Sequence, residues 1–135
     1  RFAALVFTTP AANPFMAESM RILLRCAGKE PPPSGSPGIF ALGSPGALEG
    51  ILADGGYDGI ASTVVRPALS LNSADEALQM MQAAFGVYRA VVADLPEDAQ
   101  TAAWAQVREF LQQFETGAGW QTEIEVVIAS GSSST

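Results

Sequence analysis

The sequence contains no histidine. This absence excludes, within the chain, a serine or cysteine nucleophile activated by an imidazole base and every metal site that needs an imidazole ligand. The only cysteine, Cys26, cannot form a disulfide within the chain. A single thiol suits a reducing compartment, so we expect a cytoplasmic protein in which Cys26 is a small buried hydrophobe.

Basic residues and long apolar segments are also scarce. Seven Lys and Arg stand against 14 Asp and Glu, which gives a net charge of −7, and the basic residues are scattered along the chain. Binding to a phosphate backbone needs the opposite charge balance, so we expect no nucleic-acid partner. No apolar run approaches the roughly 20 residues that cross a bilayer, so we expect no membrane span.

Glycine-rich phosphate loops are missing as well. Residues 28–30 (Gly-Lys-Glu) lack the Ser or Thr that follows the lysine of a P-loop, and residues 117–122 lack the third glycine of a dinucleotide fingerprint. The carboxylates of Asp94, Glu97 and Asp98 gather at a predicted helix start, where capping and the helix dipole explain them. Acid–base catalysis by these carboxylates is the alternative interpretation.

The first 38 residues predict a strand, a helix and a loop within a chain of single-domain length. Residues 2–7, FAALVF, are apolar without alternation, which is typical of a strand covered on both faces in a parallel sheet, although the start of a buried helix would look similar. A helix is predicted from Asn13 to the stop at 27–28, with Pro14 at its first position. Residues 29–38 are rich in proline and form a surface loop.

Glycine and proline then bracket a short amphipathic helix. Ser44 followed by Pro45 predicts a cap and a first helical residue, and the glycines at 55–56 end the helix. A strand is predicted over residues 60–66, which include adjacent valines. The apolar face of the helix is formed by Leu48, Ile51 and Leu52.

The longest helical pattern follows residue 72. Ser73 and Glu76 form a capping box for a helix reaching Val92, and a second helix begins at Pro96 and ends near Gly117. Their predicted buried stripes are Leu78, Met81, Phe85, Tyr88 and Val92 in the first helix and Trp104, Val107, Leu111 and Phe114 in the second.

The last predicted strand covers residues 122–130. Ile124, Val126 and Ile128 alternate with two glutamates, which is typical of a strand buried on one face only. Residues 131–135 are small and polar, and we expect them to form a flexible tail.

The order of these elements resembles the C-terminal half of class I S-adenosylmethionine-dependent methyltransferases, and most closely the ubiquinone/menaquinone-biosynthesis type. Residues 13–15 (NPF) match a segment that follows a late strand in that family. Residues 37–40 (PGIF) match its PG-aromatic stretch. Residues 51–57 (ILADGGY) match its LL-x-x-x-GF motif, with Tyr57 in place of phenylalanine and expected to dock into the core.

The resemblance implies an α/β fold: the C-terminal half of a Rossmann-like methyltransferase, with about three strands, the last antiparallel, and four to five helices. It places residues 1–130 in one methyltransferase domain, with a helical insertion at about 73–116. The implied strand order is fifth, seventh, sixth. The chain opens on RFAALVF without Met or a signal pattern and has no counterpart of the family's cofactor-binding half, so we expect a truncated beginning.

The implied function is transfer of a methyl group from S-adenosylmethionine (SAM) to a small-molecule acceptor, with the SAM site outside this chain, so that the chain alone is expected to be inactive. The alternative is a non-catalytic α/β module for ligand binding or dimerisation. Phe15, Met16 and Phe40 are the predicted acceptor-binding residues, because they follow a strand end or lie in a loop beside it. Core packing is the alternative role for all three.

A further expectation concerns residues 2–7, which in the family would pair with a fourth strand absent from this chain. The segment has no internal charge or proline to discourage pairing with another strand. We therefore expect the isolated chain to self-associate through this edge.

Overall fold

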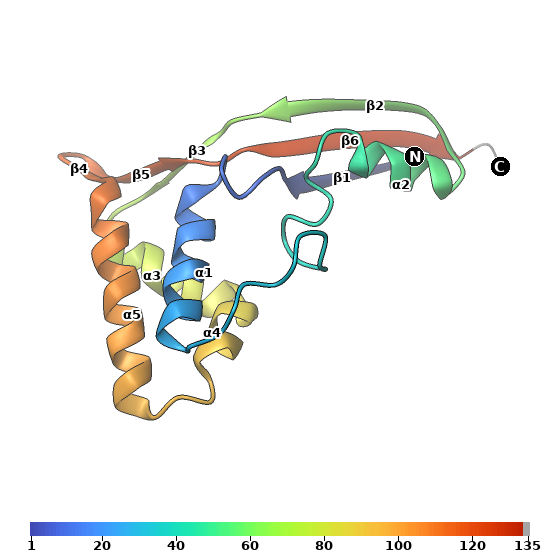
Figure 1. Cartoon of the computed structure of the whole chain (residues 1–135). Helices are drawn as coiled ribbons and strands as arrows, with labels where there is room; N and C mark the ends of the chain where they lie inside the picture. Colours follow the sequence, from blue (N-terminus) through green and yellow to red (C-terminus); the bar gives the residue numbers. More distant parts are fainter. Residues whose placement is uncertain (134–135) are drawn as a thin grey trace. The chain divides into compact units, whose positions relative to one another are not determined.

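The computed structural model describes residues 1–133, whose contacts divide into two compact units (Figure 1). Unit 1 consists of Arg1–Asn13, Pro33–Pro67 and the described residues from Glu123 onward. Unit 2 consists of Pro14–Pro32 and Ala68–Thr122. The single domain expected over the chain is thus built as two units, because strands from both ends of the chain pair with each other while most helices pack among themselves.

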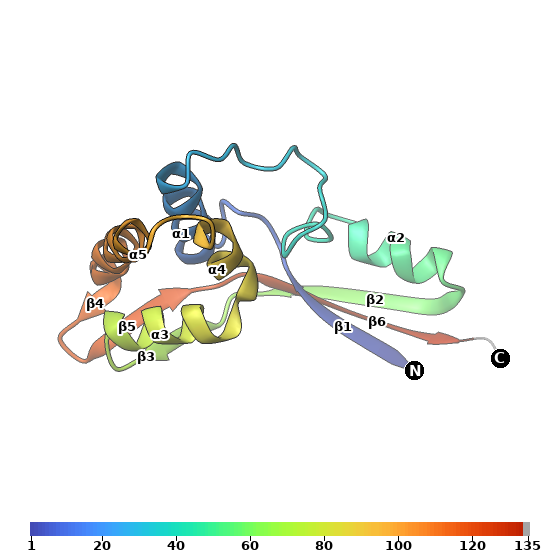
Figure 2. The same ribbon diagram turned by 90° about the horizontal axis from the view of Figure 1, so that it is seen from below.

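Unit 1 holds a three-stranded sheet and one helix. Its elements are β1 (Phe2–Phe7), α2 (Ala47–Asp54), β2 (Tyr57–Val65) and β6 (Val126–Ser133). The strand order is β1-β6-β2, and β6 is antiparallel to both neighbours. The strand order and the antiparallel direction of the last strand are therefore as expected. The strand predicted over residues 60–66 lies at Tyr57–Val65, and the last strand begins at Val126 rather than at residue 122. Helix α2 lies along one face of this sheet (Figures 1 and 2).

The core of unit 1 lies between α2 and the sheet. It consists of Leu48, Leu52, Val127 and Ala129, with Ala4, Val6, Leu42, Tyr57 and Ile60 packed around them.

Two predictions about apolar faces in unit 1 are wrong. Ile51 is 52% exposed, because α2 turns only its Leu48 and Leu52 side toward the sheet. In β6 the residues beneath α2 are Val127 and Ala129, whereas Ile128 is only half-buried. The predicted strand over residues 122–130 is interrupted at 124–125, and this break changes the phase of the alternation.

The start of α2 also differs from the prediction. Gly46, with φ of +80°, occupies the position before the helix, and no side chain caps it, so Ser44 and Pro45 do not serve as cap and first helical residue. The predicted stop is confirmed: the amide of Gly55 donates to the Ile51 carbonyl at 3.0 Å, and Gly56 adopts φ of +80°. The chain then reverses into β2, as the two glycines predict.

Strand β1 is more exposed than expected. Phe2 is 45% and Leu5 57% exposed, and within residues 1–133 β1 pairs only with β6. The expectation of a parallel strand covered on both faces is wrong within the chain, because β1 pairs in the antiparallel direction and α2 covers one face only.

Unit 2 contains most of the helices and a second, small sheet. Its elements are α1 (Pro14–Cys26), β3 (Ala68–Leu71), α3 (Ala74–Ala84), α4 (Gly86–Val92), α5 (Glu97–Leu111), η1 (Gln112–Phe114), β4 (Glu115–Thr116) and β5 (Gly119–Glu123). The second sheet has the order β3-β5-β4. The described residues thus form a mixed α/β fold with five α-helices, as expected, but with six strands rather than about three.

Helix α1 packs against α4 and α5, and α3 packs against the same two helices (Figure 2). Trp120 is buried in unit 2. Its ring centroid lies 5.8 Å from that of Phe15 and 5.7 Å from that of Phe114, and its Nε1 donates a hydrogen bond to the Leu111 carbonyl at 2.7 Å. The Tyr88 hydroxyl donates to a carbonyl of α1 at 2.9 Å, and burial raises its pKa. Every helix of unit 2 except η1 contributes fully buried residues to this core.

The long helical pattern after residue 72 is divided into α3 and α4 at Phe85, whose φ of −108° and ψ of 82° are not helical. The capping box is confirmed in its first half, because Ser73 Oγ accepts from the Glu76 amide at 3.1 Å. In its second half the Glu76 carboxylate accepts from the Asn72 amide at 2.6 Å, one residue earlier than predicted.

The last described residues extend the final strand of unit 1. Residues 131–133 belong to β6 rather than to a tail, with Gly131 opposite Phe2 and Ser133 opposite Tyr57, and residues 134–135 lie outside the described residues. Among residues 1–133, no helix has the length and apolar character needed to cross a membrane.

Candidate functional site

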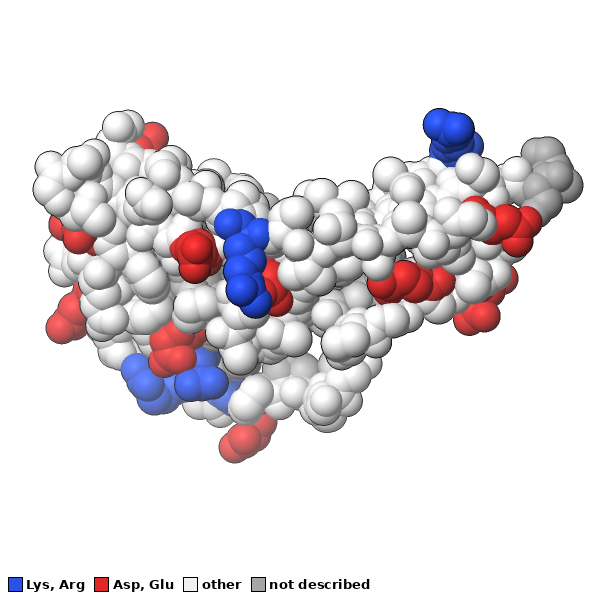
Figure 3. Space-filling model, turned by 90° about the horizontal axis from the view of Figure 1, so that it is seen from above, with Lys and Arg blue, Asp and Glu red and all other residues white. Residues whose placement is uncertain are grey.

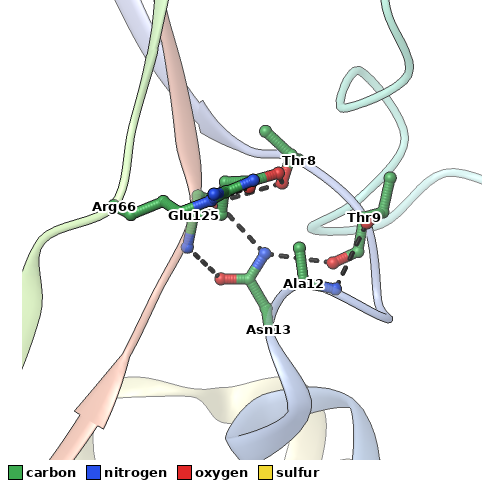
Figure 4. A network of polar contacts seen from close by, with 6 residues as sticks. All are labelled: Thr8, Thr9, Ala12, Asn13, Arg66 and Glu125. Atoms are coloured by element: carbon green, nitrogen blue, oxygen red, sulfur yellow. Dashed lines mark hydrogen bonds and ion pairs between the residues drawn. The ribbon is translucent and has the colours of Figure 1, made fainter.

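A polar network lies where β1 ends and β6 begins, at the carboxyl end of β1 (Figure 4). Asn13 is fully buried at its centre. Its Nδ2 donates to the carbonyls of Thr9 and Glu125, each at 3.0 Å, and its Oδ1 accepts from the Glu125 amide at 2.8 Å. The two hydrogen bonds to Glu125 connect the residue before α1 to the residue before β6, and the bond to Thr9 closes the turn before α1.

The Glu125 carboxylate carries the charge of this network. It accepts from Thr8 Oγ1 at 2.7 Å and from Arg66 Nε at 2.5 Å, and its side chain is 14% exposed. The Thr8 hydrogen bond and then the Arg66 contacts lower the pKa of Glu125. A general base works best with a pKa near the operating pH. A carboxylate held ionised in this way fixes the chain and does not take up protons at neutral pH.

A glycine lets the loop before α2 close over the same strand end. A Cβ built on Gly43 would lie 1.6 Å from the Thr8 carbonyl oxygen and 2.4 Å from that of Phe7. The Phe40 ring in this loop meets the Phe7 ring edge-on, with centroids 6.4 Å apart. In open α/β sheets, ligands bind beyond the carboxyl ends of the strands. The loop around Phe40 therefore borders the position where such a ligand would lie.

The structure places the three predicted acceptor-binding residues in different units. Phe15 and Met16 are 1% and 0% exposed in the core of unit 2, where Phe15 packs on Trp120. Phe40 is half-buried in unit 1. Core packing accounts for the positions of Phe15 and Met16, whereas Phe40 lies at the strand end where the sequence places it. Acceptor binding by all three residues stays a prediction.

The acidic cluster lies before and within the first turn of α5, but no side chain caps this helix, so the capping prediction is wrong. Asp98 Oδ1 accepts from the Ala99 amide at 2.9 Å, and Asp94 lies 3.6 Å from the Lys29 ammonium. No group of His, Cys, Asp or Glu side chains in the described part of the chain is arranged to hold a metal ion.

A pocket of about 380 Å³ between α3 and α5 is a site that the sequence does not reveal. Trp104, expected on the buried stripe of α5, is only half-buried and forms part of its wall, because Ala103 and Val107 take the fully buried positions. Gln100, Trp104 and Arg108 recur at four-residue steps, and this mixed polar and aromatic stripe is the signal that could have indicated a pocket. Its lining residues are Leu78, Gln82, Glu97, Gln100, Thr101, Trp104, Ala105 and Arg108.

Figure 3 shows the charged side chains on one face of the chain, where acidic and uncharged side chains lie around the basic ones. The expectation of no nucleic-acid partner stays a prediction.

No protein-family model matches this sequence, and no curated protein gives a significant match.

Proposed function

We propose that this chain forms the fifth-to-seventh-strand part of a cytoplasmic class I SAM-dependent methyltransferase that methylates a small-molecule acceptor. The observation that supports the proposal is the strand order β1-β6-β2 with β6 antiparallel in the middle. This order is the one that the resemblance implies, and it joins segments more than 100 residues apart. The SAM site then belongs to a part of the protein outside these residues.

The chemistry makes few demands on this chain. Methyl transfer by in-line displacement depends largely on proximity and orientation of the two reactants, so the absence of histidine does not argue against it. The contribution of this chain would be to border the acceptor site, with Phe40 as an apolar wall at the carboxyl end of β1. The ionised Glu125 and buried Asn13 would hold that strand end in position.

A non-catalytic module is the second candidate. The exposed apolar side chains of β1 support a dimerisation role, and the pocket between α3 and α5 supports a ligand-binding role. The methyltransferase candidate implies that the complete protein binds SAM, whereas the non-catalytic module implies no SAM site.

We expect the 135-residue chain to show no heat of binding with SAM in titration calorimetry, because it has no glycine-rich loop or ribose-binding carboxylate of the family type. The chain extended by the segment encoded directly upstream should bind SAM in the micromolar range. Micromolar binding by the chain alone would contradict the placement of the cofactor site. An extended chain that folds without binding SAM would favour the non-catalytic module.

Self-association through β1 is expected for the isolated chain, because within residues 1–133 one apolar edge of this strand has no partner strand. Sedimentation at micromolar concentration should show a dimer or larger species. Leu5 is 57% exposed, and Leu5→Lys should raise the dissociation constant of the dimer at least tenfold, since each copy would bring a lysine to the contact. Val87→Lys, at a residue 52% exposed in α4, is the matched control and should leave the mass unchanged. A monomeric unsubstituted chain would refute this expectation.

A further inference from the structure

The pocket between α3 and α5 has on its wall an aromatic side chain that is only partly buried by the fold. Trp104 is half-buried on the pocket wall, and its Nε1 donates no hydrogen bond within the described residues, whereas Trp120 is 1% exposed and bonded to a carbonyl. Leu78 of α3 and Ala105 of α5 line the same pocket. An aromatic face with aliphatic neighbours in a concave site of this volume is the usual floor of a small-molecule site.

The charge of the pocket favours a cation. Arg108 is already committed to Asp75, with Nε 2.5 Å from Oδ1 and Nη2 3.2 Å from Oδ2. Glu97, at the other end of the lining, forms no ion pair within residues 1–133. The pocket therefore presents one uncompensated charge, which is negative, and the net charge of −7 attracts cations to the chain as a whole.

The neutral polar groups around the pocket add hydrogen-bond acceptors. Gln100 Nε2 donates to the carbonyls of Leu95 at 2.9 Å and of Ala93 at 3.4 Å, which leaves its Oε1 as an acceptor. Thr101 Oγ1 donates to the Glu97 carbonyl at 3.0 Å, so its lone pairs also remain as acceptors. An ammonium group needs acceptors and has none to offer in return.

The spacing along α5 sets the dimensions of the ligand. Glu97 and Trp104 are seven residues apart, about two helical turns and roughly 10 Å along the axis, and so lie on one side of the helix. Between them lie Gln100 and Thr101. A ligand that reaches both ends needs a ring at Trp104 and a cationic group on a short chain that extends toward Glu97.

We propose that this pocket binds a small arylalkylamine, with its ring against Trp104 and Leu78 and its ammonium group directed to Glu97. The site consists of residues of unit 2 alone. It goes beyond the proposed methyl transfer and does not depend on it, since no residue at the β1 strand end takes part.

The test uses the ¹⁵N-labelled 135-residue chain and three probes that share an indole ring: tryptamine (cationic), 3-ethylindole (neutral) and indole-3-propionate (anionic). Tryptamine should shift the Trp104 indole N–H signal saturably while the Trp120 signal stays in place. Its Kd should be about two- to fivefold lower than that of 3-ethylindole, the gain of an exposed ion pair. Indole-3-propionate should bind more weakly than either.

Two substitutions on one helix separate the ammonium contact from general effects. Glu97→Gln should remove the preference for tryptamine over 3-ethylindole, whereas Glu109→Gln, at an exposed glutamate of α5 outside the lining, should keep it. Both lie on the surface and leave the core intact. Equal affinity for tryptamine and 3-ethylindole, a preference that survives Glu97→Gln, or the lack of a saturable shift at Trp104 would each overturn the proposal.

Discussion

Gly43→Ala is expected to unfold unit 1 or to destabilise it by more than about 4 kcal/mol, a size reserved for a few severe mechanisms. The added Cβ would lie 1.6 Å from the Thr8 carbonyl oxygen and 2.4 Å from that of Phe7. Both are backbone atoms at the end of a paired strand, so no side chain can rotate away to make room. Either the loop must leave the strand end or the strand must shift against β6. Urea unfolding and amide exchange of Val127 and Ala129 in β6 measure the loss.

Gly50→Ala is the matched control. Gly50 lies within α2, and a Cβ there would meet no atom within 4 Å. Alanine is the better helix former by about 1 kcal/mol, so this variant should be as stable as the parent chain or slightly more stable. If Gly43→Ala protected the β6 amides as well as Gly50→Ala does, the loop would not be seated on the strand end.

Asn13→Ala is the second large effect, with an expected loss of about 3 kcal/mol in the free energy of unfolding. The substitution removes three hydrogen bonds made by a fully buried side chain. It leaves the Glu125 amide without an acceptor, whereas the Glu125 carbonyl still accepts from the Thr8 amide at 3.1 Å. The largest part of the cost is therefore the buried amide, and equilibrium denaturation measures the total.

Asn13→Asp tests this division of the cost. Aspartate keeps an oxygen for the Glu125 amide but cannot donate to the two carbonyls, and it places a second carboxylate near Glu125. The stability of this variant should recover as the pH is lowered and the introduced carboxylate becomes protonated, whereas that of Asn13→Ala should not. Thr101→Ala, which removes a single exposed hydrogen bond in α5, should cost less than about 1 kcal/mol. A loss in Asn13→Ala no larger than this would refute the role of the network.

The elements that the sequence predicts correctly carry strong local signals. Pro14 marks the start of α1, the glycines at 55–56 mark the end of α2, and the apolar runs mark β1 and β2. The strand order is available only through the resemblance, because pairing between residues 2–7 and 126–131 has no local signal. The second sheet escapes prediction because β3 and β4 have only four and two residues.

In the candidate sites, too, the features that the sequence did not predict depend on residues that are distant in the sequence. Phe15 and Met16 follow a strand, but both are buried in the core of unit 2, where Phe15 packs against Trp120, a residue far away in the sequence. Asn13 stands out in the sequence only for its place before a helix, whereas its bonds to Glu125 arise only when both chain ends meet. Periodicity places Trp104 in the core because it identifies the side of a helix and not how far the neighbouring helix reaches around it.

The central place of β6 in unit 1 also determines when that unit can form during synthesis. Strands β1 and β2 both pair with β6 and not with each other. Strand β6 leaves the ribosome after every other described strand. The segments of unit 2, by contrast, are all complete at Thr122. The helical unit is thus free to fold before unit 1, because β1 precedes its partner β6 by more than 100 residues. During that interval the edge of β1 that later pairs with β6 is open to other chains, which exposes this strand to aggregation until β6 has been synthesised.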